Sequence, residues 1–508
     1  MRSARARCAK AALRAIEAVE PQLNAVVAGP YEDATAAEDG PLGGVPFAAK
    51  DTLPEAGRPL GFGSRMLDGF VARRDATLAD RFRAAGLVSL VRSATPEFAF
   101  NIDTAPAVHG PTRNPWNPEH GPGGSSGGAA ALVASRALPI AHANDGGGSI
   151  RIPAAWCGLV GLKPSRGRVP LGPAVGEAVG GFAHEFALTR SVRDAALLLD
   201  AVNGPAAGDR YYVERPATPF AAALEHEPGR LRVAVHTRSF FGVETTPDVR
   251  AAVLAAADAL EGLGHRVEEA CPEIADDALR ECVTTVWSVD LAELAATFEH
   301  ATGRAAGPGV VEAASWACIR HGRELTALDF QAAGRLVNST ARRWGRFLDD
   351  YDLFVCPTAP TAAPASGAGR PAHRQRGGVD QPGLFPGAVH SDRQPHRPAV
   401  DQPPARRDRR RHANRRDAHG ADAPRGAAPA GRGATRARAA MVRPSSATHL
   451  SDAELSAAGL TLLAAGAVVR RGPSVLHRGW RAVRRERRCP YEGAAIPARR
   501  HVSRARGR

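Results

Sequence analysis

Residues 142–153 read HANDGGGSIRIP, in which three consecutive glycines precede a single serine. A glycine in regular structure costs about 0.5–1 kcal/mol relative to alanine, so a run of three needs a reason. One reason is a flexible turn before an isoleucine-rich, strand-like stretch, with Ser149 as its cap. The other is a site where the bare N–H groups of Gly146, Gly147 and Gly148 approach an anion or developing oxyanion beside a nucleophilic serine. These residues alone leave both interpretations open.

The sequence around this stretch alternates between helical and strand patterns. Helical periodicity over 75–86 is followed by a short apolar run at 87–91, and a strand pattern at 230–236 precedes a helix over 246–264. Such alternation is typical of α/β domains with a substantially parallel sheet. We therefore predict an α/β fold.

The positive charge of the chain is confined to its last part. The formal net charge is +14, but residues 366–508 hold 30 arginines against 10 acidic residues, whereas residues 1–365 hold 36 basic and 42 acidic residues. Between 366 and 445 there is one leucine, Leu384, and no isoleucine, tyrosine or tryptophan, which is too little apolar surface for a core. Capping-box spacing predicts one short helix at 451–469. We expect an α/β domain over 1–365 and an Arg/Pro/Ala-rich tail that is disordered or out of frame.

Cysteine usage and apolar runs restrict the compartment and the cofactors. The seven cysteines include no C-x-x-C pair, and none has the spacing of zinc ligands. The N-terminal residues form an amphipathic helical pattern rather than a signal peptide. No uncharged apolar run approaches the roughly 20 residues that span a bilayer. We expect a cytoplasmic protein with no metal, no cofactor and no membrane partner; no feature indicates an oligomeric state.

A second serine candidate lies upstream, in GPGGSSGGAAALVAS at 121–135. Gly123, Ser125 and Gly127 fit G-x-S-x-G, the nucleophile elbow of α/β-hydrolases, which requires a strand before it and a helix after it. The pattern predicts a helix over 128–135, but the preceding TRNPWNPEHGP has too many prolines and asparagines for a central strand. A phosphate loop is disfavoured because no G-K-[ST] follows the glycines. Ser125 is thus a second candidate nucleophile.

Lysine is rare enough in this chain to be informative. Only Lys10, Lys50 and Lys163 occur among 66 basic residues. Arginine can replace lysine in a surface ion pair but cannot accept a proton. Lys50 ends the apolar stretch PLGGVPFAAK, and burial would lower the pKa of its amine from about 10.4 and make the neutral form available as a base. A surface lysine of no chemical role is the alternative.

Taken together, these features resemble the amidase signature family. Ser125 and Ser149 are 24 positions apart, which is that family's spacing. The likeness covers about residues 10–365, with a core at about 42–170, and it rests on three stretches in the family's order: LGGVPFAAKD (42–51), GPGGSSGGAAA (121–131) and NDGGGSIRIPAAWCGLVGLKPSRGRVP (144–170).

Within the family, the last stretch is most similar to the branch that contains 6-aminohexanoate-cyclic-dimer hydrolase. It is less similar to the glutamyl-tRNA amidotransferase A subunits, which more usually carry D-T-G-G-S. Gly146 stands where those proteins have threonine, a tolerable change if the position contributes only backbone.

The resemblance implies an α/β/α sandwich with a large mixed, mostly parallel sheet, whose C-terminal strands are missing here. It also implies a Ser–Ser–Lys triad. Ser149 attacks an amide carbonyl and carries the acyl group, Ser125 on a cis peptide relays the proton, and neutral Lys50 is the final base. The substrate is a small amide, whose acyl pocket could include part of 313–335.

The same resemblance assigns roles to the loop around the nucleophile. The backbone N–H groups of Gly146, Gly147, Gly148 and Ser149 form the oxyanion hole, in which one donor is worth roughly 2.7–4 kcal/mol of barrier. Asp145 and Arg151, which flank the loop, are expected to brace it as an ion pair.

Other functions remain open. Residues 1–365 could be the glutamine-hydrolysing subunit of a tRNA-dependent amidotransferase, which would need a partner and tRNA for turnover. The tail could bind nucleic acid, but it lacks the interleaved aromatics of stacking platforms and any DNA-binding motif.

A third interpretation treats the tail as an out-of-frame translation, which would make the chain an inactive or incompletely folded amidase product. VHSDRQPH (389–396) can be encoded by codons that read F-T-V-T-G-N-P-T after a one-base shift. The continuation to 408 can then give V-Q-L-S-I-S-L-P-L-A-V, an alternating strand pattern. The nucleotide sequence around codons 365–390 tests this hypothesis.

Overall fold

The computed structural model describes residues 2–32, 40–240, 243–274, 276–366 and 468–469. Its larger sheet has six strands, of which the central β3, β2 and β4 are parallel while β1, β6 and β5 are antiparallel to their neighbours. The strands follow the order β1 (Val26–Ala28), β3 (Val88–Ser93), β2 (Pro46–Lys50), β4 (Ile140–Asp145), β6 (His184–Thr189) and β5 (Val160–Gly161). A mixed sheet of this kind agrees with the predicted α/β class.

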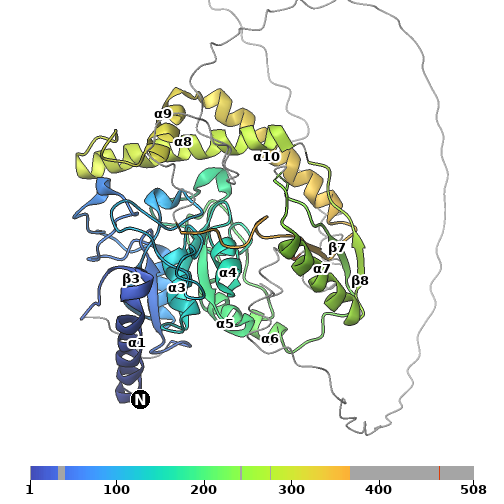
Figure 1. Ribbon diagram of the computed structural model, residues 1–508, viewed down its shortest axis with the longest axis horizontal. Coiled ribbons are helices and arrows are strands. Elements are labelled where there is room, and N and C mark those ends of the chain that lie inside the picture. Colours follow the sequence, from blue (N-terminus) through green and yellow to red (C-terminus); the bar gives the residue numbers. More distant parts are fainter. Residues whose placement is uncertain (1, 33–39, 241–242, 275, 367–467, 470–508) are drawn as a thin grey trace, which may run out of the picture. The chain divides into compact units, whose positions relative to one another are not determined.

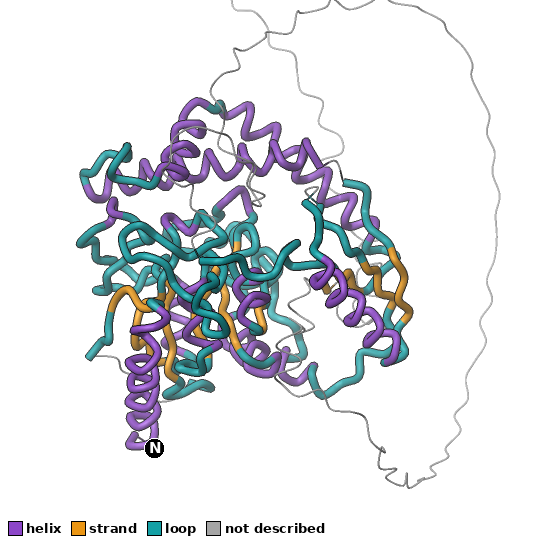
Figure 2. The backbone as a smooth tube through the Cα atoms, in the orientation of Figure 1, coloured by secondary structure: helices purple, strands orange, loops and turns teal. Residues whose placement is uncertain are grey.

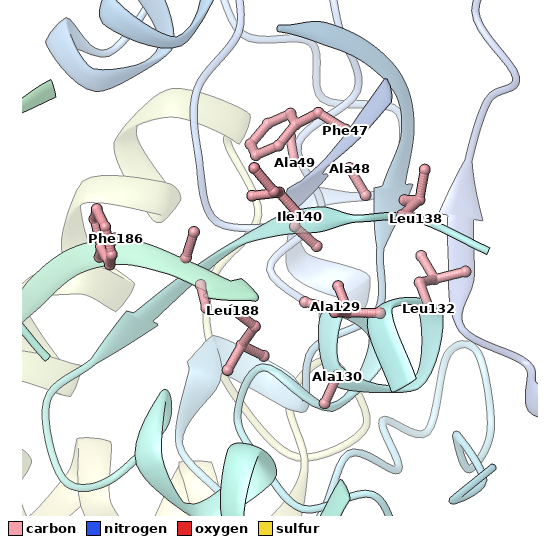
Figure 3. Packing of buried hydrophobic residues seen from close by; sticks show 14 of the residues in the cluster. Phe47, Ala48, Ala49, Ala129, Ala130, Leu132, Leu138, Ile140, Phe186 and Leu188 are labelled. Atoms are coloured by element: carbon pink, nitrogen blue, oxygen red, sulfur yellow. The ribbon is translucent and has the colours of Figure 1, made fainter. Parts of the chain in front are cut away.

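Helices cover both faces of this sheet. The ring of Phe82 on α2 (Thr77–Ala84) lies 4.8 Å from the ring of Phe47 on β2. Figure 3 shows Phe47 on the opposite side of the sheet from the side chains of α3 (Gly127–Ala134). Helix α3 is buried along its length and approaches the sheet so closely that a Cβ on Gly128 would lie 2.3 Å from the Ala94 nitrogen. Two covered faces form the expected sandwich.

The remaining helices of this part frame the sheet. Ser191 caps α5 by accepting a hydrogen bond from the Asp194 N–H, and apolar residues at helical spacing, among them Leu198 and Val202, are buried beneath it. The helices are α1 (Arg2–Leu23), α4 (Arg151–Cys157), α5 (Val192–Val202) and the short α6 (Phe220–Ala223). Among the described residues, no helix combines the length and the apolarity that crossing a bilayer requires.

Three long helices follow later in the chain and, together with Met66, Phe98 and Val179 from earlier segments, form a second apolar cluster. They are α8 (Asp276–Thr302), α9 (Ala313–Glu324) and α10 (Ala327–Phe347). A capping box of Thr326 and Asp329 begins α10. Helix α8 packs against both α9 and α10 (Figure 2). The cluster buries Trp287 and Phe298 of α8.

A second, four-stranded sheet has the order β10–β9–β7–β8. Its strands are β7 (Arg232–Val235), β8 (Arg266–Glu269), β9 (Leu353–Val355) and β10 (Val468–Val469), and α7 (Pro247–Gly262) packs against it (Figure 1). Val233 and Val235 face the buried side chains of α7, whereas Phe354 packs with aromatic residues at the end of α10. The strand predicted at 230–236 and the helix predicted over 246–264 correspond to β7 and α7, but that they belong to a separate sheet was not predicted.

The tail prediction meets the structure at two residues. Val468 and Val469 pair antiparallel with Phe354 and Leu353 at the edge of β9, so the end of the helix predicted at 451–469 is a strand instead. Two adjacent valines favour the extended backbone that this edge offers. The predictions for 367–467 and 470–508, including the shifted frame, lie outside the described residues.

One local prediction at the glycine run was wrong. Residues 150–153 do not continue as a strand; the strand β4 precedes the glycines and the helix α4 follows them. The carboxylate of Asp145 accepts the N–H groups of Ile150 and Arg151 at the start of α4, which is the helix end that favours negative charge. Gly158 ends the helix in a left-handed conformation. The order is therefore strand, glycine loop and helix.

Candidate active site

Lys50 is the last residue of β2 and is fully buried. Its Nζ lies 2.7 Å from Ser125 Oγ, 3.1 Å from Ser126 Oγ and 2.6 Å from Asn144 Oδ1. Two elements bring these groups together, because the serines precede α3 and Asn144 lies on β4, the strand beside β2. The structure thus unites two of the predicted site residues, Lys50 and Ser125.

These contacts determine where the lone pair of a neutral Lys50 amine points. Asn144 Oδ1 can only accept a hydrogen bond, so it takes one N–H of the amine. Ser126 donates its own hydroxyl proton to the Asn144 carbonyl at 3.3 Å, so its Oγ takes the second N–H. The lone pair is then left for the hydroxyl of Ser125. In its neutral form Lys50 is aimed at Ser125 as a proton acceptor.

The electrostatic surroundings of Lys50 favour this neutral form near neutral pH. Burial lowers the pKa of the amine to about 7, although the carboxylates of Glu185, Asp145 and Asp51 act in the opposite direction. A lysine in this range is present as base and as acid at the same pH. Such a group can both take up and return a proton.

A second layer of polar groups orients the contacts of Lys50. The backbone N–H of Lys50 donates to His142 Nδ1 at 3.3 Å, so the other ring nitrogen, Nε2, carries the proton and donates to Glu185 at 2.6 Å. Glu185 also accepts the Asn144 amide at 3.2 Å, and Thr52 Oγ1 accepts it at 3.0 Å. Because the Asn144 amide nitrogen is fixed in this way, its oxygen must face Lys50.

The loop that carries Ser125 has an unusual but well-supported backbone. The Gly124–Ser125 peptide is cis. Thr104 holds the loop by donating to the Gly123 carbonyl at 2.8 Å and by accepting from the Gly127 N–H at 3.1 Å. Residues 101–124 contain no strand, so the structure lacks the strand that a G-x-S-x-G elbow needs.

Asp145 organises the loop of Ser149. Its carboxylate accepts the Gly148 N–H at 2.7 Å and forms a bidentate ion pair with Arg151 at 2.8 and 2.7 Å. Burial alone would raise the pKa of Asp145, but the Arg151 charge and the N–H donors outweigh burial and hold this pKa well below its usual range. Gly148, at φ +121°, lies where most side chains would strain the backbone. The loop is thus tied to a permanently charged carboxylate.

Four backbone N–H donors were predicted for the oxyanion hole, and in the structure one of them is already hydrogen-bonded whereas three are not. The Gly148 N–H is engaged by Asp145. The N–H groups of Gly146, Gly147 and Ser149 make no hydrogen bond with the described residues, and neither does Ser149 Oγ. These three N–H groups and the Ser149 hydroxyl are therefore available to a ligand.

A cavity of about 330 Å³ opens onto both serines. The residues that line it include Ser125, Asn144, Gly146 and Ser149. Ser125 and Ser149, two of the predicted catalytic residues, therefore border the same cavity. Most of its other lining is apolar: Leu53, Phe62, Leu78, Phe98, Val175, Val179, Trp287, Leu291 and Leu294. Among the described residues, no group of three or more His, Cys, Asp or Glu side chains is placed to hold a metal ion.

Sequence reasoning missed the helix that lines this cavity. Trp287, Asp290, Leu291 and Leu294 on α8 line it, whereas no residue of 313–335, the stretch expected to contribute, does so. The spacing of these four residues is i, i+3, i+4 and i+7, which could have indicated one helical face. It could not have indicated that this face borders Ser149.

Comparison with known proteins agrees with this geometry. The family described as Amidase matches residues 7–381. The 6-aminohexanoate-cyclic-dimer hydrolase of Paenarthrobacter ureafaciens is 37% identical over 371 residues, covering 70% of this chain and 75% of that protein. An acylamidase of Rhodococcus erythropolis is 34% identical, with 70% and 75% covered.

Solved structures give the same result. The structure of 6-aminohexanoate cyclic dimer hydrolase complexed with substrate superposes with a TM-score of 0.68 at 36% identity, covering 72% of this chain and 78% of that one. These likenesses extend over most of each protein and include the fold as well as the sequence. The chain belongs to the amidase signature family and is an amidohydrolase.

Proposed function

We propose that the chain hydrolyses the amide bond of a small amide through an acyl-enzyme on Ser149. One observation supports this above all: a buried Lys50, with a pKa of about 7, is aimed at Ser125 beside a cavity that Ser149 also lines. We place the catalytic domain in residues 1–365.

The first half of the reaction acylates the enzyme. Ser149 Oγ attacks the amide carbonyl, its proton passes to Ser125, and the Ser125 proton passes to Lys50. The carbonyl oxygen becomes an oxyanion that accepts hydrogen bonds from the N–H groups of Gly146, Gly147 and Ser149. When the C–N bond breaks, the proton returns from Lys50 through Ser125 to the leaving nitrogen, which departs as an amine.

The second half releases the acyl group. Water attacks the Ser149 ester and gives a proton to the same relay, and the relay returns it to Ser149 as the C–O bond to the enzyme breaks. The Asp145–Arg151 ion pair keeps the loop in place in both halves. In each half, the positive charge that Lys50 gains arises together with the negative charge of the oxyanion, so the net charge of the buried site stays constant.

The cavity favours substrates with an apolar chain. Its lining is largely aliphatic and aromatic, and its volume suits a small molecule. The relatives named above are a cyclic-dimer hydrolase of 6-aminohexanoate and an acylamidase. We propose linear or cyclic amides of aliphatic acids as the substrate class.

The test is amine release by the purified full chain from the cyclic dimer of 6-aminohexanoate, an aliphatic acyl anilide and glutamine. We expect hydrolysis of one of the first two with no partner and no metal added. If glutamine is the only one of the three substrates hydrolysed, and only when a partner protein and tRNA are added, the amidotransferase-subunit alternative is supported instead. The Lys50→Met chain is the control for background hydrolysis.

A further inference from the structure

Helix α8 carries one acidic side chain in an otherwise apolar wall of the cavity. Trp287, Asp290, Leu291 and Leu294 share the helical face that borders the cavity. Three of the four are apolar. Asp290 is the exception, and a carboxylate is costly to bury unless something pairs with it.

The protein itself satisfies only half of this carboxylate. Oδ1 accepts the Val179 N–H at 2.6 Å, whereas Oδ2 makes no hydrogen bond with any described residue. Burial raises the pKa of Asp290 to about 6, and the nearby Glu293 acts in the same direction. The Val179 hydrogen bond is the only influence that lowers this pKa. No described cation stabilises the charge.

The other acidic residues of the cavity differ from Asp290, because each already accepts a hydrogen bond or ion pair from a side chain. Asp145 pairs with Arg151, Glu185 with His142, and Asp75 with Arg83. Asp290 is therefore the one carboxyl group, among the described residues lining the cavity, that has no side-chain partner.

The position of Asp290 suits contact with a substrate held at the nucleophile loop. A Cβ on Gly146 would lie 3.1 Å from Trp287 Cη2, so α8 touches this loop through Trp287. Asp290 is three residues further along the helix, and side chains at this spacing are neighbours, with Cβ atoms about 5–6 Å apart. A group several bonds from the scissile carbonyl can reach it.

We propose that Asp290 is a specificity subsite, whose Oδ2 accepts a hydrogen bond from a nitrogen of the substrate remote from the scissile amide. The donor is an ammonium group or a second amide N–H. This inference rests on the proposed function, since it assigns a substrate class to the same cavity. It predicts that the enzyme prefers amides with a second nitrogen over plain alkyl amides.

Binding is measured by calorimetry in the Ser149→Ala chain, in which no turnover consumes the ligand. Three matched probes are used: N-hexylacetamide, N-(6-aminohexyl)acetamide and hexamethylene bisacetamide. We expect the two probes with a second nitrogen to bind at least tenfold more tightly than N-hexylacetamide. Equal affinity for all three would overturn the proposal.

Two variants at Asp290 and one control sharpen the result. When Asp290→Leu is added to the Ser149→Ala chain, the two probes with a second nitrogen should bind more weakly, and the preference for them over N-hexylacetamide should disappear. With Asp290→Asn, which keeps an acceptor oxygen without the charge, preference for the ammonium should fall more than preference for the amide. Glu281→Gln, which removes an exposed carboxylate on the same helix that does not act on Asp290, should change nothing.

The outcomes for the subsite and for the reaction are separable. A preference that survives Asp290→Leu overturns the subsite, whatever the enzyme hydrolyses. If the preference depends on Asp290 but the chain with Ser149 intact hydrolyses none of the probes, the subsite stands and the proposed hydrolysis of such amides fails. In the active chain, Asp290→Leu should raise KM for the two probes with a second nitrogen more than it raises KM for N-hexylacetamide.

Discussion

The polar groups around Lys50 are almost completely satisfied by the protein, whereas the α8 wall of the cavity keeps one carboxylate oxygen without a partner. At Lys50, every contact of the amine has a defined direction, from Ser126 and Asn144 back to Glu185 and His142. At α8, only one oxygen of Asp290 is bound. A closed network holds catalytic groups rigidly, and an open position is where a substrate supplies the missing contact. We infer that chemistry and selectivity are assigned to different regions.

The largest expected effect lies at the nucleophile. Ser149→Ala should reduce kcat by about 10⁴-fold or more, since loss of an attacking oxygen leaves only binding and oxyanion stabilisation. The thermal unfolding midpoint should not change, because Ser149 Oγ makes no hydrogen bond with the described residues. Near-normal turnover in Ser149→Ala, together with loss in Ser125→Ala, would make Ser125 the nucleophile.

Removal of the titratable amine should be nearly as damaging. Lys50→Arg keeps the charge but cannot accept a proton, and Lys50→Met removes both, so each should reduce kcat by about 10²–10⁴-fold. Circular dichroism checks that both variants fold. Retention of most activity in the arginine variant would show that Lys50 is only a structural cation.

A smaller effect tests the second layer behind Lys50. Activity requires neutral Lys50, so kcat/KM should fall as pH drops through the pKa of about 7. The Glu185 carboxylate raises this pKa, and its removal in Glu185→Gln should lower it and move the acid limb to lower pH. Asp75→Asn, which removes a cavity carboxylate that does not act on Lys50, is the control. An unmoved limb in Glu185→Gln would contradict the assignment.

The smallest expected effect lies where the two regions touch. A methyl group on Gly146 would come within 3.1 Å of Trp287, so Gly146→Ala should disturb the loop and lower kcat about tenfold. Adding Trp287→Leu should restore part of this loss, because it removes the crowded ring. If the loss of kcat in the double variant equals the sum of the two single losses in free energy, the contact between residues 146 and 287 does not couple the two regions.

The sequence pointed to residues that the fold brings close together: Lys50 lies 2.7 Å from Ser125, and Ser125 and Ser149 line one cavity. Lys50, Ser125 and Ser149 stand out because glycine runs and a scarce lysine are visible along the chain. The order of strand, loop and helix around Ser149 was only partly predicted. The start of α4 is stabilised by the Asp145 carboxylate, which accepts its first N–H groups, and no pattern among the residues of α4 itself indicates that start.

The rest depends on contacts between distant segments. His142 and Glu185 are joined only because β4 and β6 pair in one register, and no spacing in the sequence reports that register. The same holds for α8, whose apolar face is typical of any packed helix. Gly148 was misassigned as an oxyanion donor because its N–H partner, Asp145, follows from the folded loop alone.

The most direct measurement is the mass of the trapped intermediate. The full chain is mixed with an activated acyl ester, quenched in acid during turnover and digested for peptide mapping. We predict one added acyl group, located on Ser149, which is absent in Lys50→Met at the same time point. An acyl group on Ser125, or turnover without any acylated peptide, would contradict hydrolysis through Ser149.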